Sequence, residues 1–495
     1  MESFTKCHLY MNYLSKRILT NDIFLYLFSR YITYFVMFIT SMIIATKLGP
    51  YYFGVWSFIL LIIQYIQNFD FGIPNSYNVF YIHNKEDSVA KSSYTINAVY
   101  LISLLSLLVL ILSVLIAQYD INLIKKYRIE KYIPLIGVIS AFQFYYNFVV
   151  AFLRVSNNFK SLTFVISFVG VFSFIAALLF TGERLLILLS VGYIIAYMLS
   201  IIIALVNNSY VLHISWKMDI NLQRKIIKKG FYLFLYNLFI NSIILSLRFL
   251  ISTYYRVEDF GIFSFSYSLV LAIMLLLNSV SFLVFPKIID KLSGIDNNNV
   301  LESINIYRKC YVFSSHLLIY CAFPVFPLFL IFFPQYHGAL QSLEIISLTI
   351  LLSTHTAGFV ELLIAQNRER LLSLFSFYAF VINALLAWLF IEKVNMPFSH
   401  VILATLITYL LYTEVLSFFG LKILNLKYTI KNIFFISNIR LLFPYGTALV
   451  VSLANIKSLV LLPLLLFLIF NKEEIKNLFL MIKKLIIDPS LIRVG

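Results

Sequence analysis

The sequence predicts an all-α, polytopic membrane protein with about 12 to 14 transmembrane helices. The 495 residues are 61% hydrophobic and only 12% charged, with a mean hydropathy of +0.91. Soluble domains are nearer half apolar and a quarter charged. The apolar runs reach the roughly 20 residues that a helix needs to cross a bilayer. The short alternating segments typical of a membrane β-barrel are absent from the sequence.

Fourteen apolar stretches are predicted as helices, and the last two are the weakest because Arg440, Pro444 and Pro463 interrupt them. Their ranges are 23–46, 52–78, 93–117, 133–153, 162–180, 185–206, 231–253, 262–285, 311–333, 341–364, 371–391, 399–420, 434–454 and 457–471. The chain is predicted to divide into four parts. These are a six-helix half (1–206), a basic cytoplasmic linker (207–230), a second six-helix half (231–420), and C-terminal helices with a cytoplasmic tail (421–495).

The placement of basic residues predicts that both termini lie in the cytoplasm. Of the 38 Lys and Arg, 27 fall in the set of alternate loops that includes both termini, 9 fall in the opposite set, and 2 lie inside helices. Basic residues are enriched in cytoplasmic loops. The net charge of +16 is therefore explained by membrane topology, and no nucleic acid partner is expected.

One turn segment occurs in two similar copies in the chain. Residues 47–58 read KLGPYYFGVWSF and residues 254–265 read YYRVEDFGIFSF. Phe53-Gly54 and Phe260-Gly261 are 207 positions apart, and Thr46, Ser57 and Phe58 recur at the same offset as Thr253, Ser264 and Phe265. Six predicted helices, an even number, separate equivalent points, so the two halves would share one orientation in the membrane. Parallel six-helix repeats of this kind are a recognised plan of transporters.

Each half carries one arginine on an equivalent polar stripe of its first helix. At 100° per residue, one stripe holds Arg30, Tyr34, Met37 and Ser41, and the other holds Asn237, Asn241, Ile244 and Arg248. At ~1.5 Å per residue, Arg30 lies about 10 Å and Arg248 about 26 Å from the inner ends of their helices.

Arginine binds phosphate oxygens in pairs and stays charged. The residues predicted to line a cavity for an anionic headgroup are Arg30, Arg248, Tyr34, Asn237 and Asn241. Two alternatives remain open: a structural ion pair between Arg30 and Asp70, and snorkelling of either arginine to the membrane interface.

Three acidic residues, Asp70, Glu361 and Glu414, are predicted in the inner parts of helices. Such acids could bind Na⁺ or H⁺ to drive transport, or each could make one polar contact between helices. His316 and His355 are isolated in the sequence, and the three cysteines lack metal or redox spacing. No catalytic residue, metal site or resident cofactor is predicted.

Several segments together resemble a known family. TKLGPYYFGVWSF (46–58) and FDFGIPNSY (69–77) resemble the first hairpin of bacterial polysaccharide flippases of the O-antigen translocase (Wzx) type. The segments EDFGIFSFSYSL (258–269), NSVSFLVFPKI (278–288) and LLIAQNRER (362–370) are similar to later segments of that family. One departure is Asn241-Ser242-Ile243, where many relatives carry an acidic residue. The family belongs to the multidrug/oligosaccharidyl-lipid/polysaccharide (MOP) exporter superfamily.

The resemblance implies a MATE-like fold that works by alternating access in the bacterial cytoplasmic membrane. It implies a transporter, not an enzyme, that moves undecaprenyl-pyrophosphate-linked oligosaccharide for O-antigen of lipopolysaccharide, capsule or another surface polysaccharide. A polysaccharide polymerase and a chain-length regulator are the implied protein partners.

Two other classes of function stay open from the residues. A cation-coupled multidrug exporter of the same superfamily shares the architecture. A membrane polysaccharide polymerase would be expected to carry a long, Arg-bearing outer loop, whereas the longer loops here, 207–230 and 286–310, are predicted inside. A sugar O-acyltransferase would need a histidine motif, which His316 and His355 lack.

Overall fold

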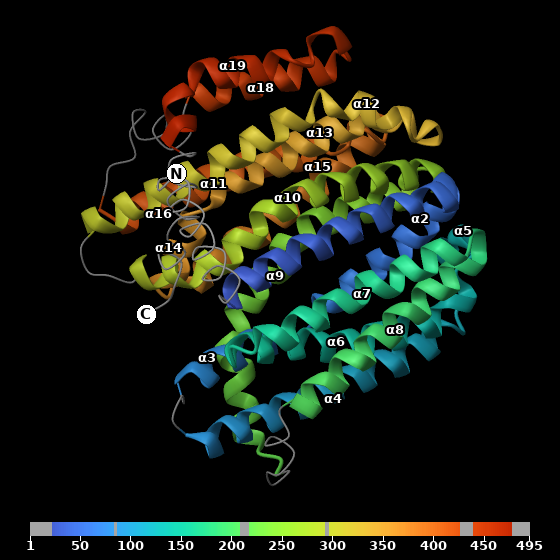
Figure 1. Cartoon of the computed structure of the whole chain (residues 1–495), viewed down its shortest axis with the longest axis vertical. Coiled ribbons are helices and arrows are strands. Elements are labelled where there is room, and N and C mark those ends of the chain that lie inside the picture. Colours follow the sequence, from blue (N-terminus) through green and yellow to red (C-terminus); the bar gives the residue numbers. More distant parts are fainter. Residues whose placement is uncertain (1–21, 84–86, 208–216, 293–296, 426–438, 478–495) are drawn as a thin grey trace, which may run out of the picture. The chain divides into compact units, whose positions relative to one another are not determined.

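The computed structural model describes residues 22–83, 87–207, 217–292, 297–425 and 439–477, and every regular element within these ranges is a helix (Figure 1). The predicted all-α class is therefore confirmed. The chain forms two compact units, the first from Met1–Leu48 and Phe69–Phe231 and the second from Gly49–Asn68 and Tyr232–Gly495.

The first unit is a bundle in which α4, α6, α7 and α8 lie side by side (Figure 1). Its helices, some of which extend into the second unit, are α2 (Asp22–Gln67), α3 (Ile73–His83), α4 (Ser88–Ile116), α5 (Asn122–Tyr127), α6 (Ile133–Val155), α7 (Phe159–Leu179), α8 (Gly182–Asn207) and the start of α9 (Ile220–Tyr254). The predicted linker ends inside α9, because residues 220–230 continue into the seventh predicted helix without a break. Residues 208–216 of that linker lie outside the described residues.

The second unit combines the end of α2, most of α9 and all later helices. Its further elements are α10 (Val257–Leu292), α11 (Asn297–Ala322), α12 (Val325–Ile331), α13 (Ala339–Ser353), η4 (Thr354–Thr356), α14 (Phe359–Ala365), α15 (Glu369–Glu392), α16 (Leu403–Ile423), α18 (Ile439–Leu453) and α19 (Leu462–Phe470).

Among the described residues, ten helices are long and apolar enough to cross a membrane, and a bent pair makes an eleventh. The bent pair is Ser303–Ala322 with Val325–Ile331, which meet at 45° where Pro324 interrupts the predicted helix 311–333. The first of the ten, Arg30–Gln67, covers parts of two of the predicted helices, 23–46 and 52–78. The two C-terminal apolar helices, Ile439–Leu453 and Lys457–Phe470, are shorter than a span.

Helix α2 is broken at Gly49, which divides it into a first arm (22–48) and a second arm (50–67). Gly49 has φ 66° and ψ 173°, a conformation open to glycine, and Pro50 follows it. The Gly-Pro pair thus ends one helix and starts the next, as the sequence predicts, and the second arm belongs to the second unit.

Two further helices predicted as continuous, besides 311–333, are interrupted. The predicted helix 52–78 breaks between α2 and α3, where Phe71 and Gly72 have positive φ. The predicted helix 341–364 breaks at Gly358, whose φ is 87°. Hydropathy does not predict such breaks, because each break involves only a few residues and lies within apolar sequence.

The two copies of the repeated turn pack directly against each other within the second unit. A Cβ placed on Gly54 would lie 2.3 Å from the carbonyl oxygen of Val257, and one on Gly261 would lie 2.0 Å from that of Pro50. Pro50 and Val257 are themselves 207 positions apart, as are the two glycines. The contacts are therefore reciprocal, as in a two-fold interface.

Aromatic side chains follow the same local symmetry. Phe53 meets Phe265 at 6.3 Å between ring centroids, and Phe58 meets Phe260 at 6.5 Å, both edge to face. Each pair maps onto the other under the offset of 207. Edge-to-face pairs add about 0.5–1.5 kcal/mol beyond their burial. The repeated segments thus form one local two-fold contact, in which only glycine permits the close approach of the two helix starts.

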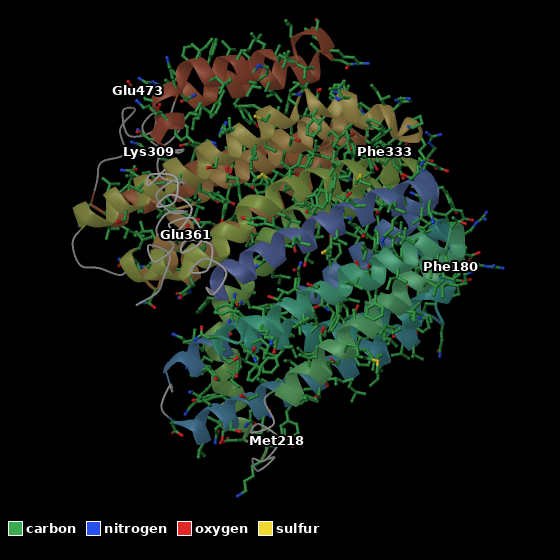
Figure 2. The ribbon with its side chains drawn as sticks, viewed as in Figure 1. Phe180, Met218, Lys309, Phe333, Glu361 and Glu473 are labelled. Carbon is green, nitrogen blue, oxygen red and sulfur yellow. The ribbon has the colours of Figure 1, made fainter. Side chains whose placement is uncertain are left out.

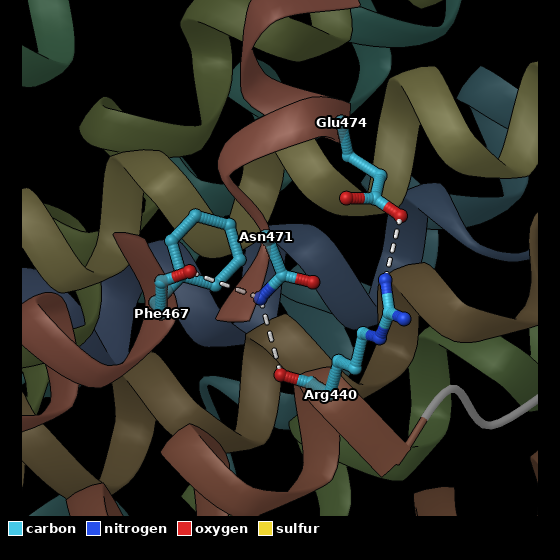
Figure 3. Close-up of polar contacts among 4 residues, drawn as sticks. All are labelled: Arg440, Phe467, Asn471 and Glu474. Carbon is cyan, nitrogen blue, oxygen red and sulfur yellow. Dashed lines mark hydrogen bonds and ion pairs between the residues drawn. The ribbon is translucent and has the colours of Figure 1, made fainter. Parts of the chain in front are cut away.

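The C-terminal helices α18 and α19 lie along each other at one edge of the second unit (Figure 1). The buried amide of Asn471 donates to the carbonyl oxygens of Arg440 and Phe467 at 3.1 and 3.0 Å. The Arg440 guanidinium also pairs with Glu474 at 3.5 Å (Figure 3). These contacts join the beginning of α18 to the end of α19.

Replacing either repeated glycine should destabilise the protein. Gly54→Ala or Gly261→Ala places a methyl group against backbone, and such overpacking costs typically 1–3 kcal/mol. Thermal unfolding in detergent should show a lower midpoint for both variants. Gly446→Ala is the matched control, since a Cβ there meets nothing within 4 Å and alanine favours a helix. Equal midpoints for all three variants would contradict the close contact.

Candidate functional site

Arg248 on α9 is buried among aromatic side chains and is only 4% exposed. Its guanidinium lies 4.9 Å from the ring centroid of Tyr267 and 6.0 Å from that of Phe260. Its Nη1 donates to the side-chain oxygen of Gln64, on the second arm of α2, at 2.8 Å. The aromatic faces stabilise a cation, while Gln64 supplies a neutral acceptor.

The charge of Arg248 is not balanced by a carboxylate among the described residues. None of the four ion pairs found there includes Arg248, and its electrostatic neighbours are Tyr267 and Tyr65. Its Nε is buried with no hydrogen-bond partner in the described part of the chain. A buried cation is costly unless it is paired. The side chain is therefore suited to bind an anion. Its burial inside the protein argues against simple snorkelling.

The predicted stripe on α9 faces the second arm of α2 at two points. Besides the Arg248–Gln64 bond, the exposed Asn241 amide approaches the side-chain oxygen of Asn68 at 3.4 Å. Asn237 is half-buried on the same helix. The two partners of the stripe are four residues apart: Gln64 lies in the second arm and Asn68 lies one residue past its end. Gln64 and Tyr65 are site residues that sequence analysis missed, because they lie more than 180 positions from Arg248.

A buried amide holds α9 in place beside the arginine. Asn383 on α15 is fully buried, and its amide donates to the backbone oxygen of Ile243 at 2.7 Å and to Ser246 at 3.2 Å. Thr405 on α16 donates to the Asn383 oxygen at 2.8 Å. These bonds connect three helices within about one turn of Arg248.

In the first unit, Arg30 and Tyr34 of the predicted stripe contact each other. The Arg30 Nε donates to the Tyr34 hydroxyl, and the guanidinium lies 5.3 Å from the Tyr34 ring centroid. Arg30 is half-buried. Further along the stripe, Met37 packs against Gly170 of α7, where a Cβ would lie 2.9 Å from Met37 Cγ.

Asp70 shapes the turn between α2 and α3. Its carboxylate accepts the N–H of Gly72 at 2.8 Å, and this bond accompanies the positive φ of Phe71 and Gly72. Burial raises the pKa of Asp70 to about 6, and the Gly72 N–H partly opposes that rise. The structure thus gives Asp70 a local turn contact.

Glu361 and Glu414 are brought together around a buried arginine that sequence analysis missed. Arg308 on α11 interacts electrostatically with both carboxylates, and its guanidinium lies 4.8 Å from the ring centroid of Phe359. Glu361, labelled on α14 in Figure 2, accepts the N–H of Gly358 at 2.6 Å and approaches the Tyr307 hydroxyl at 3.5 Å. No group of three or more metal-ligating side chains occurs in the described ranges.

Comparison with known structures defines the fold. An inward-facing MATE-family multidrug resistance transporter of the MOP superfamily is 12% identical, with a TM-score of 0.61 over 80% of this chain and 94% of that one. The lipid II flippase MurJ, in an inward closed conformation, is 18% identical, with a TM-score of 0.62 over 92% and 99%. A MOP superfamily transporter from Pyrococcus furiosus is 12% identical, with a TM-score of 0.55 over 83% and 97%.

These likenesses identify the class: the chain has the fold of the MOP transporter superfamily. The family follows from the sequence, because the profile of the polysaccharide biosynthesis protein family matches residues 19–290, more than half of the chain. The chain belongs to that family. No curated protein sequence matches it. The resemblance to the polysaccharide branch of the superfamily, predicted from short motifs, is confirmed.

Replacing Asp70 by Asn should stabilise the protein in a pH-dependent manner. Burial raises the pKa of Asp70 in the folded state from 3.8 to about 6. Ionisation of this carboxyl group therefore lowers the free energy of unfolding, with the full effect above about pH 6 and no effect below about pH 4. Asparagine avoids the penalty and keeps an oxygen for the Gly72 N–H. Unfolding midpoints in detergent should therefore be higher for Asp70→Asn at pH 7.5 and equal to wild type at pH 4. A lower midpoint at pH 7.5 would contradict this assignment.

Proposed function

We propose that this protein is a flippase that moves undecaprenyl-pyrophosphate-linked oligosaccharide across the bacterial cytoplasmic membrane by alternating access, with both termini in the cytoplasm. Membership of the polysaccharide biosynthesis family supports the polysaccharide role. The fold shared with a lipid II flippase supports transport of a lipid-linked sugar. The product would enter O-antigen of lipopolysaccharide, capsule or another surface glycan, through a polymerase and a chain-length regulator.

The observation that carries the proposal is the buried, carboxylate-free environment of Arg248. A pyrophosphate supplies the negative charge that this guanidinium lacks, and arginine binds phosphate oxygens in pairs. The rings of Tyr267 and Phe260 exclude water, which strengthens the interaction. Asn241 and Gln64 offer neutral polar groups nearby for a sugar headgroup or phosphate oxygen.

We assign Arg30 and Tyr34 as a second phosphate-binding pair, because their contact pre-orients the guanidinium beside a hydroxyl. Asn237 completes the proposed headgroup residues on α9. A flippase breaks no bond, so these residues need only bind and release the anion. Release of the anion matters as much as its binding. A neutral partner such as Gln64 can hydrogen-bond to the arginine after one substrate leaves and before the next one binds.

Transport of drugs is the alternative within the same superfamily, since a MATE-family multidrug resistance transporter shares the fold. The two functions differ in the charge they require. A cationic dye would be repelled by an unpaired arginine, whereas a pyrophosphate would be attracted. Efflux of ethidium without any effect on surface glycan would favour the drug transporter.

Removal of the Arg248 charge should abolish most export. Deleting the gene should leave lipid-linked repeat units on the cytoplasmic leaflet. In that deletion strain, an Arg248→Gln copy should restore surface polysaccharide about tenfold less well than a wild-type copy. The reason is that a hydrogen bond to a charged group contributes about 1.5–3 kcal/mol. Surface glycan would be quantified at equal protein abundance.

Arg256→Gln is the matched control for this experiment. Arg256 is exposed, lies two residues past the end of α9 and pairs with Asp259 in the first turn of α10, so its loss should leave export unchanged. Wild-type export by Arg248→Gln would contradict the assignment. Loss of export by both variants would indicate a general effect of charge and would also count against it.

A further inference from the structure

The first turns of α9 present a row of basic side chains on the first unit. Residues 217–231 contain five basic residues and one acidic residue. Four of the basic residues are exposed and fall on one side of the helix at 100° per residue. These four residues form the basic face: Arg224, Lys225, Lys228 and Lys229. A row of one charge sign attracts anions.

The opposite side of the same turns packs against the first unit. Gln223, Ile226 and Gly230 are buried and form one stripe. The Gln223 amide donates to the side-chain oxygen of the buried Asn97, on α4, at 3.3 Å. A Cβ on Gly230 would lie 2.8 Å from the carbonyl oxygen of Gly72. These contacts fix the rotation of the helix, so that the basic face points away from the unit.

No ion pair neutralises the basic face in the described part of the chain. None of the four ion pairs found there involves it. The one acidic residue of the segment, Asp219, instead caps the helix, because its carboxylate accepts the N–H groups of Asn221 and Leu222 at 2.8 and 3.2 Å. Like charges one turn apart on a helix repel each other. A negatively charged partner from outside the chain would therefore stabilise this surface.

The length of α9 places the basic face at the edge of the membrane. The helix has 35 residues, and at ~1.5 Å per residue it is about 52 Å long, whereas the hydrocarbon core is about 30 Å thick. Phe231 begins the apolar stretch of α9, and Asn97, which contacts Gln223, stands directly before the apolar run 98–117 of α4. Residues 224–229 lie between these two levels, which is where lipid headgroups are found.

We propose that the basic face binds the phosphate headgroups of anionic phospholipids in the leaflet that it meets. Each Lys or Arg near an anionic membrane surface adds to the attraction. Long basic side chains can also lay their apolar stems along the hydrocarbon edge while the charge reaches a phosphate. With the termini placed as proposed above, this leaflet is the cytoplasmic one. The inference concerns the surrounding lipid and does not depend on which molecule is transported.

The test counts the lipids that the full-length protein retains. Wild type would be purified in mild detergent with equimolar phosphatidylglycerol, which is anionic, and phosphatidylcholine, which is zwitterionic, and the bound lipids would be counted by native mass spectrometry. The ratio of bound phosphatidylglycerol to phosphatidylcholine should fall about tenfold when the four charges are removed, because each contributes to the attraction. The variant is Arg224→Gln/Lys225→Gln/Lys228→Gln/Lys229→Gln, which keeps the buried stripe.

A charge-matched control removes four basic residues from residues 125–131 of the same unit. Two of them are already paired, Lys125 with Asp120 and Lys131 with Glu183, so the control should keep the wild-type lipid ratio. The control variant is Lys125→Gln/Lys126→Gln/Arg128→Gln/Lys131→Gln. A wild-type ratio in the α9 variant, or an equal fall in both variants, would overturn the proposal.

A charge-preserving variant separates charge from packing. Arg224→Lys/Lys225→Arg/Lys228→Arg/Lys229→Arg should keep the preference for phosphatidylglycerol, and its loss would overturn the proposal. The same preparations would be given undecaprenyl pyrophosphate. Removal of its binding together with that of phosphatidylglycerol in the α9 variant would assign the face to the substrate and would also overturn it. Failure of undecaprenyl pyrophosphate to bind any of the proteins would count against the proposed flippase function and leave the phospholipid result unaffected.

Discussion

The close approach of Gly54 and Gly261 is the contact on which the arrangement of the second unit depends. Each glycine lets a helix start touch the backbone of the other copy, and the phenylalanine pairs Phe53–Phe265 and Phe58–Phe260 close around it. The contact fixes the second arm of α2 against α10. From there the arm runs on to Gln64 and Asn68, which meet Arg248 and Asn241 on α9. The repeated turn thus positions the polar partners of the buried arginine.

A second constraint on the structure is the free-energy cost of placing a charged side chain in the hydrocarbon region of the membrane. Charged residues inside membrane segments are expensive and persist where they are paired or functional. Two arginines are buried in the part of the chain that the structure describes, and their surroundings differ. Arg308 has the carboxylates of Glu361 and Glu414 nearby, which compensate its charge. Arg248 has aromatic rings and one amide around it. One arginine is thus compensated within the protein, and we propose that the other is compensated by the anion of the substrate.

Much of the fold follows from one-dimensional signals, whereas the site follows from them only in part. Apolar run length predicts the helices, and the offset of 207 predicts which segments correspond. The same offset singles out Arg248 as a charge within a helix. Hydropathy does not predict the helix breaks at Gly72 and Gly358, because a positive φ has no effect on the local composition. The Arg248–Gln64 and His316–His355 hydrogen bonds are not predicted from the sequence either. They depend on how distant helices pack and not on spacing along one helix.

We propose that the protein moves a pyrophosphate-linked sugar lipid. The most direct measurement follows reconstituted protein in vesicles, with an impermeant quencher reporting how fast a fluorescent saccharide on undecaprenyl pyrophosphate crosses the bilayer. A matched lipid in which a neutral linker replaces the pyrophosphate tests the role of the anion. We expect rapid crossing of the pyrophosphate lipid and background crossing of the neutral one. Equal rates for the two lipids, or background rates for both, would contradict the proposed function.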